Sequence, residues 1–579
     1  MAHIPVVSRL RVSEYFDLAL ALLAILLEQV LRVTIAVFPS RTVDYVRYKA
    51  IPSIPRVFRG FMDHDGHDDD EPIDPIADMT HIRDMVEHFG FPLEEHLVYS
   101  DGYCLGIHRI PHGPFPPPVG APESSTGAPR ANGSAKGSLS SSADDVMVLP
   151  PTPISVHGRL VVLLWHGFMM CSEVWVCSRT NSLAFMLAED GYDVWLGNNR
   201  GNKYAFKHLS KNPNDAEFWD FSLDHYTQDL SNVVDYILAQ TGQPSLIYVG
   251  FSQGTAQLFA ALSSNPALNQ KIRLACCLAP TGKPHDLKHS LVASLVKSSP
   301  SLLYLLFGRK SAIPSVFFWQ RVFARHMFIR VMDASMAFLF SWTNSEMSRS
   351  AKLSHYYHLY SPASVKSVVH WFQIIRGSFS MYDDAPGLLA PHALTHVPAS
   401  YPLRNIKTPI ALFYGGRDTL SDLGFLLSQL PTPAFVLKVQ EYEHLDCLWA
   451  SSAHSRLFPA VVGVMRALGA QHPDGTRAEV PRDLVADEVV AEALAHGTAQ
   501  LGVLEMATRA EDETVLETVA KLRGVRKRVV AAAPRGGTMR DGTRVVAHGA
   551  GKKLAARGHG RHVQVAARAE REVSESGSE

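Results

Sequence analysis

A serine stands between two glycines at the point where an apolar run ends and a helical pattern begins. In "LIYVGFSQGTAQLFAAL" the apolar run reaches Gly250, Ser252 follows, and Gly254 opens the helical stretch. G-x-S-x-G in this setting is typical of a nucleophile on a strand-to-helix turn, because glycines permit a sharp turn and a close approach of strand and helix. The pentapeptide alone also fits an ordinary glycine-rich connection. Its context favours a serine nucleophile for acyl transfer.

A nucleophilic serine needs a base within hydrogen-bond reach and an acid that orients the base. In proteins that carry the serine on such a strand-to-helix turn, the acid and the base both follow the serine in the chain, and the acid comes first. Asp418 comes directly after the apolar run "IALFYGG", and His444 follows the run "AFVLKVQ". Asp422 is a poorer alternative acid because it lies further from the strand end. Ser252, Asp418 and His444 therefore form the predicted triad.

The negative oxygen of a tetrahedral intermediate needs hydrogen-bond donors. The backbone N–H of Gln253, just after the serine, is the first candidate. The second comes from the loop after an earlier strand, where "LLWHGFMM" offers the backbone N–H of Phe168. His166 in the same loop is interpreted as a structural member of the turn and not as the base.

The elements that must position these residues alternate between strand and helix patterns. Strand patterns in "LVVLLWHG", "YDVWLGNNRG", "RLACCLAP" and "IALFYGG" are unbroken apolar runs. Such runs predict an α/β fold with a mainly parallel sheet covered on both faces. "HLVYSDGYCLGIHRI" predicts a hairpin that turns at Asp101-Gly102. Residues 283–392 show helical spacing and predict an inserted helical cap over an apolar site, with a plain helical layer as the alternative.

The charge, cysteine spacing and acidic segment of the chain argue against nucleic-acid binding and against zinc and calcium sites. A net charge of -1 gives no overall attraction to nucleic acid, so no nucleic-acid partner is expected. The six cysteines are scattered without the paired spacing of a zinc site, which favours free thiols. The acids and histidines of "DHDGHDDDE" lack the ligand register of a calcium loop and are interpreted as a solvated linker.

An apolar segment near the N-terminus, from Phe16 to Phe38, is long enough to cross a bilayer, since its 23 residues would span about 34 Å as a helix. Its 14 Leu, Ile, Val and Phe residues are opposed by Glu28 and Arg32, which are spaced to pair with each other. A half-inserted hairpin, an interfacial helix and a buried soluble helix are the alternatives. Basic residues after the segment place the catalytic part on the cytosolic side.

The remaining segments complete the predicted organisation. An N-terminal anchor with its flank covers 1–60, an acidic linker 61–75, the catalytic domain 76–468 and a low-complexity, partly basic tail 469–579. Within the domain, 111–158 is rich in Pro, Gly, Ser and Ala and is predicted to be a disordered insertion. The basic part of the tail is either a lipid-associating segment or a solvated tail with no specific role.

Several long motifs occur together and in order. They are "HFGFPLEEHLVYSDGYCLGIHRIPHG", "LLWHGFMMCSEVW", "GNNRGNKYA", "YVGFSQGT", "YGGRDTLSD" and "EHLDCLW". On these motifs residues 76–468 resemble the acid lipases of the α/β-hydrolase fold, the gastric and lysosomal type. Within that family the chain is most similar to the fungal membrane-anchored steryl ester hydrolases.

The resemblance implies an α/β-hydrolase fold, the Ser252, Asp418, His444 triad and an oxyanion hole from Phe168 and Gln253. It implies hydrolysis of steryl esters or acylglycerols by an acyl-enzyme route at a membrane or lipid-droplet surface, with no metal or organic cofactor. An intracellular membrane location follows, in the endoplasmic reticulum, lipid droplet or plasma membrane, while the oligomeric state stays undetermined. A non-catalytic lipid-binding scaffold and an acyltransferase that uses the same serine are the rival functions.

Two features depart from the family pattern. The family usually has His where Phe251 stands before the nucleophile, and secreted animal members have a cap disulfide, whereas residues 283–392 contain no Cys. Phe251 replaces no member of the triad, so activity is expected to survive. The missing cysteines favour an intracellular branch.

Overall fold

The structure is a computed structural model and describes the central part of the chain. It describes isolated positions between 19 and 30 and the following ranges: 74–114, 159–284, 290–384 except 313, 398–469 except 432, and 499–500. Most of the predicted anchor, linker, insertion 111–158 and tail 469–579 lies outside these residues. Where helices are described, none is both long and apolar enough to span a bilayer.

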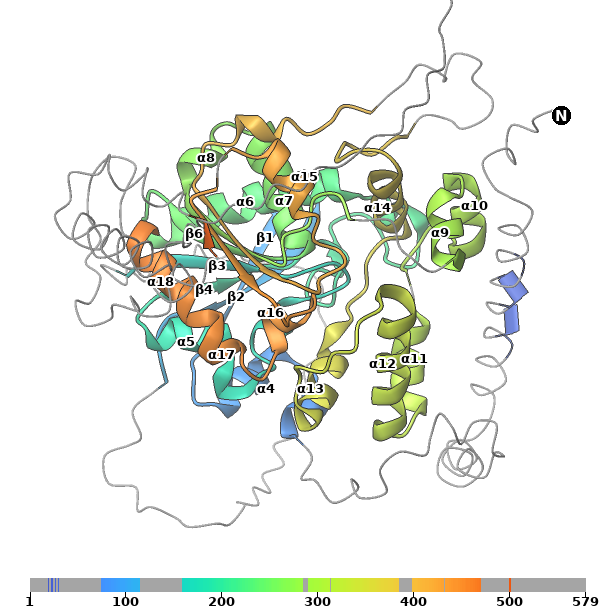
Figure 1. The fold of residues 1–579 in the computed structure, drawn as a ribbon, viewed down its shortest axis with the longest axis horizontal. Coiled ribbons are helices and arrows are strands. Elements are labelled where there is room, and N and C mark those ends of the chain that lie inside the picture. The colour runs from blue at the N-terminus through green and yellow to red at the C-terminus, as the bar shows by residue number, and fades with distance from the viewer. Residues whose placement is uncertain are drawn as a thin grey trace, which may run out of the picture. The chain divides into compact units, whose positions relative to one another are not determined.

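One sheet organises the described residues (Figure 1). Its ten strands are β1 (Glu94–Ser100), β2 (Tyr103–Ile110), β3 (Val161–Trp165), β4 (Asp193–Leu196), β5 (Lys207–His208), β6 (Leu246–Phe251), β7 (Ile272–Leu278), β8 (Ile410–Gly415), β9 (Phe435–Val439) and β10 (Ala499–Gln500). The strand order is β1-β2-β4-β3-β6-β7-β8-β9-β10, with β5 paired to β2. Strands β4, β3, β6, β7, β8 and β9 run parallel, and antiparallel pairs occur toward both edges. The predicted mainly parallel sheet is confirmed.

Helices cover both faces of this sheet. Around the strands lie α4 (Ile82–His88), α5 (Leu183–Glu189), α6 (Leu223–Thr241), α7 (Gln253–Ser264), α8 (Leu268–Lys271), α15 (Leu423–Gln429), α16 (Asp446–Trp449), α17 (Ala453–Arg456) and α18 (Phe458–Gly469). Short 3-10 helices are η3 (Pro75–Asp78), η4 (Ser172–Trp175), η5 (Arg179–Asn181), η6 (Ala216–Trp219) and η8 (Leu403–Asn405).

The unbroken apolar runs of the strands result from this double cover. In β6, Ile247 and Val249 pack in the core that contains α5 and α18, whereas Leu246 and Tyr248 pack in the core that contains α6 and α7. Successive side chains of a strand point to opposite faces, so both sets must be apolar when both faces are buried. The two cores hold β6, and with it the turn that carries Ser252, rigidly in the middle of the sheet.

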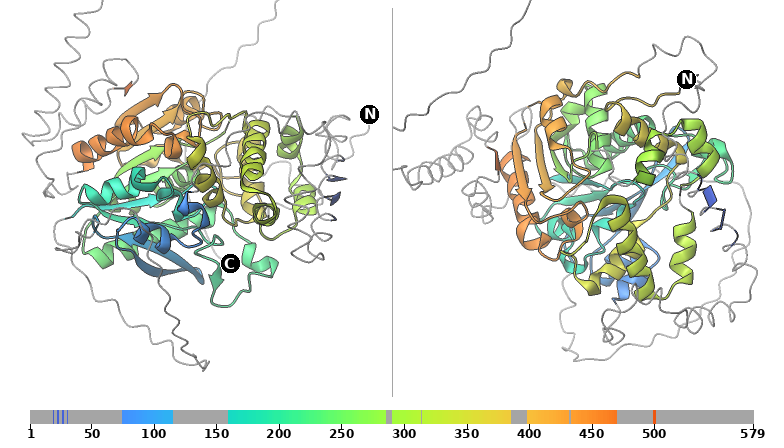
Figure 2. Two further views of the ribbon diagram at one scale, coloured as in Figure 1. Left: turned by 90° about the horizontal axis from the view of Figure 1, so that it is seen from below. Right: turned by 45° about the vertical axis from the view of Figure 1, so that its right-hand side comes forward.

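The chain between β7 and β8 forms a helical insert, residues 290–384. It contains α9 (Ser290–Lys297), α10 (Pro300–Phe307), α11 (Ser315–Val322), α12 (Arg325–Phe340), α13 (Arg349–Leu359) and α14 (Val365–Arg376). Figures 1 and 2 show α9 to α12 grouped at the side of the sheet opposite α18. The predicted helical cap 283–392 overlaps this insert, and its role as a cap stays a prediction.

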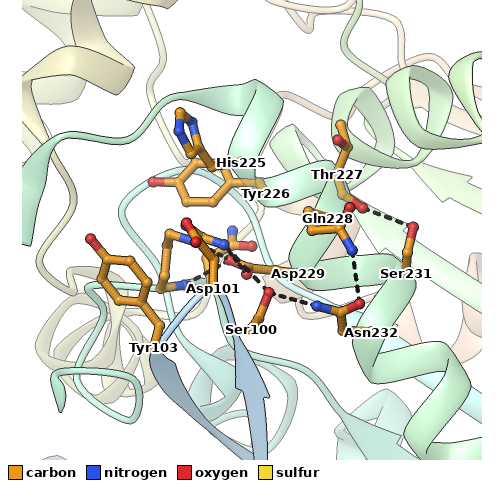
Figure 3. Close-up of polar contacts among 12 residues, drawn as sticks. Ser100, Asp101, Tyr103, His225, Tyr226, Thr227, Gln228, Asp229, Ser231 and Asn232 are labelled. Atoms are coloured by element: carbon orange, nitrogen blue, oxygen red, sulfur yellow. Dashed lines mark hydrogen bonds and ion pairs between the residues drawn. The ribbon is translucent and has the colours of Figure 1, made fainter. Parts of the chain in front are cut away.

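A buried arginine joins the hairpin, the loop after β4 and α6. The guanidinium of Arg200 donates to both carboxylate oxygens of Asp229, at 2.9 and 2.7 Å, and to Asp101 at 3.2 Å. It lies over the ring of Tyr103, 4.5 Å from the ring centroid. Figure 3 shows Asp229 on its helix facing the hairpin residues Asp101 and Tyr103. Because each charge of this buried pair has its partner, the loop after β4 is fixed in place.

Candidate active site

Ser252 occupies the sharp turn between β6 and α7. Its backbone has φ 51 and ψ -118, a strained conformation for a residue with a side chain. A Cβ on Gly250 would lie 3.1 Å from the backbone carbon of Gly254. A Cβ on Gly254 would lie 2.6 Å from the carbonyl oxygen of Trp165 on β3. The two glycines are therefore required by close backbone approach, and the predicted strand-to-helix turn is what the structure has.

The structure brings Ser252, His444 and Asp418 together in one hydrogen-bonded chain. Nε2 of His444 lies 2.7 Å from Oγ of Ser252, and Nδ1 of His444 lies 2.8 Å from Oδ2 of Asp418. Asp418 follows β8 and His444 follows β9, so parallel strands deliver both side chains to the same edge as Ser252. Asp422, the alternative acid, accepts a hydrogen bond from the Phe425 N–H at the start of α15. Asp418 is thus the carboxylate that orients the histidine.

The surroundings of Asp418 keep its carboxyl ionised. Burial raises the pKa of this group, but the charge of His444 and hydrogen bonds from His444, Ser421 and the Leu420 N–H lower it, and the net pKa lies below its ordinary value. The Ser421 hydroxyl donates to Oδ2 at 2.7 Å, and the Leu420 N–H donates to Oδ1 at 2.8 Å. A charged Asp418 stabilises the Nδ1–H tautomer of His444, which leaves Nε2 free to accept the serine proton.

Phe168 and Gln253, the two predicted oxyanion donors, come from different elements near the turn that carries Ser252. Phe168 follows β3, and Gln253 is the first residue of α7. Within the part of the chain that the structure describes, neither backbone N–H has a hydrogen-bond partner. The side chain of Gln253 is held by the helical insert, since its Oε1 accepts a hydrogen bond from the indole N–H of Trp371 at 2.8 Å. Neither N–H group is thus occupied by another described residue, and the oxyanion hole from Phe168 and Gln253 stays a prediction.

His166 fixes the loop that carries Phe168. Its Nδ1 lies 2.8 Å from the Gly167 carbonyl, so this nitrogen is the donor. Its Nε2 accepts from the backbone N–H of Asn199 and from the side-chain amide of Asn202, each at 3.2 Å. Burial lowers the pKa of His166 to about 4, partly offset by the bond to Gly167. A neutral imidazole with both nitrogens occupied is a structural member of the turn, and the loop stabilised by Arg200 supplies its partners.

Two aromatic rings contact His444. Phe251 is fully buried, and its ring centroid lies 5.2 Å from that of His444. A Cβ on Gly167 would lie 3.0 Å from the Phe251 ring, so Phe251 also packs under the loop that carries Phe168. Trp342, from the helical insert, stacks on His444 with ring centroids 5.2 Å apart and planes 11° apart. Sequence reasoning did not single out Trp342, because its local pattern indicated only a helical segment.

The described residues offer no obvious place for a metal ion. Among them, no group of three or more His, Cys, Asp and Glu side chains could hold one. The acidic and histidine-rich stretch 63–71 lies outside them. All six cysteines are described and have free thiols, in agreement with the sequence interpretation.

A serine on a strand-to-helix turn, joined to a histidine and a carboxylate on a mainly parallel sheet, is the arrangement of the α/β-hydrolases, a fold that includes lipases and esterases. The family model for the alpha/beta hydrolase fold matches residues 161–451, and the model for a partial alpha/beta-hydrolase lipase region matches residues 82–179. The chain belongs to the acid lipase family of this fold, the family that includes the gastric and lysosomal lipases. This confirms the family predicted from the sequence motifs.

Relatives of known name support the assignment along most of the chain. A probable lipase of Schizosaccharomyces pombe is 38% identical over 461 residues, which cover 78% of this chain and 94% of the relative. Human gastric triacylglycerol lipase is 33% identical, with 66% of this chain and 90% of the relative covered. Rat lysosomal acid lipase/cholesteryl ester hydrolase is 32% identical, with 68% and 93% covered.

Proposed function

We propose that this protein is a serine hydrolase that cleaves neutral-lipid carboxylic esters, steryl esters or triacylglycerols, to a free fatty acid and an alcohol. The observation that carries the proposal is the chain of hydrogen bonds from Asp418 through His444 to Ser252, at 2.8 and 2.7 Å. These distances are those required for a base that takes the serine proton while its other nitrogen is held.

Acylation begins with attack of the Ser252 Oγ on the ester carbonyl carbon, while Nε2 of His444 accepts the hydroxyl proton. The carbonyl oxygen becomes negative and accepts hydrogen bonds from the backbone N–H groups of Phe168 and Gln253. When the tetrahedral intermediate collapses, the bond to the alcohol oxygen breaks and His444 returns the proton to that oxygen. The fatty acyl group stays on Ser252 as an ester.

Deacylation repeats the sequence with water as nucleophile. Nε2 of His444 accepts a proton from water as the oxygen attacks the acyl carbon, and the second tetrahedral intermediate uses the same two N–H donors. Collapse breaks the bond to Ser252, which regains its proton from His444, and releases the fatty acid. Through both halves Asp418 stays ionised and stabilises the imidazolium.

The substrate class rests on the insert and on the relatives. The insert packs Trp371 against Gln253 and Trp342 against His444, so the surroundings of the proposed site are largely apolar, which supports a neutral-lipid ester as substrate. Two relatives carry triacylglycerol and cholesteryl ester in their names. A membrane-anchored intracellular location, with the catalytic domain in the cytosol and lipid at a membrane or droplet surface as partner, rests on Phe16–Phe38 and its basic flank.

The test compares Ser252→Ala with the parent on emulsified cholesteryl, ergosteryl and triacylglycerol esters, using the full chain. Removal of the nucleophile should lower kcat by about 10⁶-fold, the order found for the serine of a comparable triad. Ser263→Ala is the matched control, since Ser263 lies buried on the same helix and its hydroxyl donates only to Ala260, at 2.9 Å. It should leave kcat nearly unchanged.

Three outcomes separate the rival functions. Equal activity in Ser252→Ala and the parent would refute the nucleophile. A parent that neither hydrolyses any ester nor reacts with a serine-directed phosphonate is a scaffold and not an enzyme. A parent that forms new ester when a sterol acceptor is added, in preference to fatty acid, is an acyltransferase.

A further inference from the structure

The loop after α12 places an indole ring directly on the histidine of the triad. Trp342 is 3% exposed and stacks on His444, with ring planes 11° apart. Phe340, at the end of α12, stacks on the same indole, with ring centroids 4.4 Å apart. The imidazole of His444 therefore contacts a ring from β6, Phe251, and a ring from the helical insert.

Hydrogen bonds anchor this loop beside Asp418. The indole N–H of Trp342 donates to Oγ1 of Thr419 at 2.9 Å, and the Thr419 hydroxyl donates to the Phe340 carbonyl at 3.1 Å. Thr419 is the residue after Asp418, so the indole is held relative to the acid of the triad as well as to its histidine.

A second anchor joins the loop to the residue before His444. The carboxylate of Glu443 is buried. It accepts hydrogen bonds from the backbone N–H groups of Thr343 and Asn344, each at 2.8 Å, and from the Thr343 hydroxyl at 3.0 Å. Ser341 and Asn344 have positive φ values, 62 and 49. Such backbone conformations are costly for residues other than glycine and persist where the surroundings impose them.

We propose that Trp342 is a positioning residue of the ester hydrolysis, acting through His444. Its indole face keeps the imidazole plane aligned so that Nε2 points at Ser252, and it stabilises the imidazolium that exists while His444 carries the serine proton. Aromatic faces attract cations, most strongly for tryptophan and most effectively where water is excluded. The inference rests on the hydrolase function proposed above, and it assigns to the insert a part in the chemistry in addition to substrate binding.

Trp342→Leu and Trp342→Phe test this in the purified full chain with p-nitrophenyl butyrate, a soluble ester for which no lipid interface is needed. Trp342→Leu removes the ring and should lower kcat about 5- to 30-fold with KM changed less than about 2-fold. Trp342→Phe keeps a stacked ring but loses the indole N–H, and it should restore most of kcat. Trp319→Leu is the matched control, because Trp319 lies in the same insert and stacks on Phe323.

Circular dichroism and thermal unfolding establish that each variant is folded. If Trp342→Leu does not fold, Trp342→Met replaces it in the same comparison of kcat and KM. The inference is overturned when Trp342→Leu keeps the parental kcat, when Trp342→Phe loses as much as Trp342→Leu, or when only KM changes. Those results require an active parent. A parent with no serine-dependent esterase activity instead refutes the proposed function itself, so the two failures are distinguishable.

Discussion

Asp446 is a buried acid two residues after His444, and its replacement by asparagine should remove a pH-dependent loss of stability. The side chain is fully buried, its Oδ2 accepts the Glu443 N–H at 2.7 Å, and its Oδ1 has no hydrogen-bond partner among the described residues. Burial raises the pKa of Asp446 from an ordinary value of 3.8 to about 6; the hydrogen bond from Glu443 opposes this rise and the charge of Glu443 adds to it.

The size and sign of the effect follow from proton linkage. The folded state binds this proton more tightly than the unfolded state, so the stabilisation is complete below the unfolded pKa and is lost as pH rises to about 6. The pKa difference corresponds to about 3 kcal/mol of unfolding free energy. Asparagine can accept the same Glu443 N–H but does not titrate. Asp446→Asn should therefore be more stable than the parent by up to about 3 kcal/mol at about pH 7.5, and this gain should fall to about 0.5 kcal/mol at about pH 4, close to the unfolded pKa.

Urea unfolding followed by circular dichroism at both pH values measures the difference. Asp235→Asn makes the same charge change at a half-exposed position paired with Lys271, and it should alter stability by less than about 1 kcal/mol at either pH. The reasoning is refuted when Asp446→Asn is less stable than the parent at the higher pH. It is equally refuted when the gain is the same at both pH values, since a gain independent of pH is not due to titration.

Two further substitutions test the site and its support. Asp418→Asn should lower kcat on the order of 10⁴-fold with KM nearly unchanged, because the amide no longer selects the productive tautomer of His444. Steady-state kinetics measure both constants, and a loss of kcat below about tenfold would contradict the assignment. Asp229→Asn should lower the unfolding free energy by about 3 to 5 kcal/mol, because Arg200 loses its buried counter-charge. A loss below about 1 kcal/mol in urea unfolding would show that water or another group compensates the guanidinium.

Local features of the sequence were enough to predict the sheet and the turn. The hairpin at Asp101-Gly102 is confirmed by the pairing of Ser100 with Tyr103, because both turn residues adopt the positive φ values that Asp-Gly favours. The unbroken apolar run of β6 predicted a doubly covered strand, and its alternate residues do pack in two separate cores. Such signals depend on neighbouring residues only, so a single sequence carries them.

The surroundings of the histidine could not be predicted in this way. Trp342 and Glu443 are about a hundred residues apart in the chain, and each lies in a segment whose pattern indicates only helix or loop. Their contacts arise because β8 and β9 deliver Asp418 and His444 to the edge where the loop after α12 also arrives. The ion pair of Arg200 with Asp229 could not be predicted either, because Arg200 stood in the sequence only as one residue of a motif and the pair forms through the packing of α6.

The sequence by itself determined which residues can do chemistry and on which local elements they stand. Glycines at 250 and 254 and apolar runs before Asp418 and His444 are short-range signals of turns and buried strands. Tertiary structure alone decided what touches the reacting groups. In the sequence, Phe251 was only a departure from the family pattern. In the folded protein its ring lies buried against His444, because packing joins residues that no spacing along the chain relates.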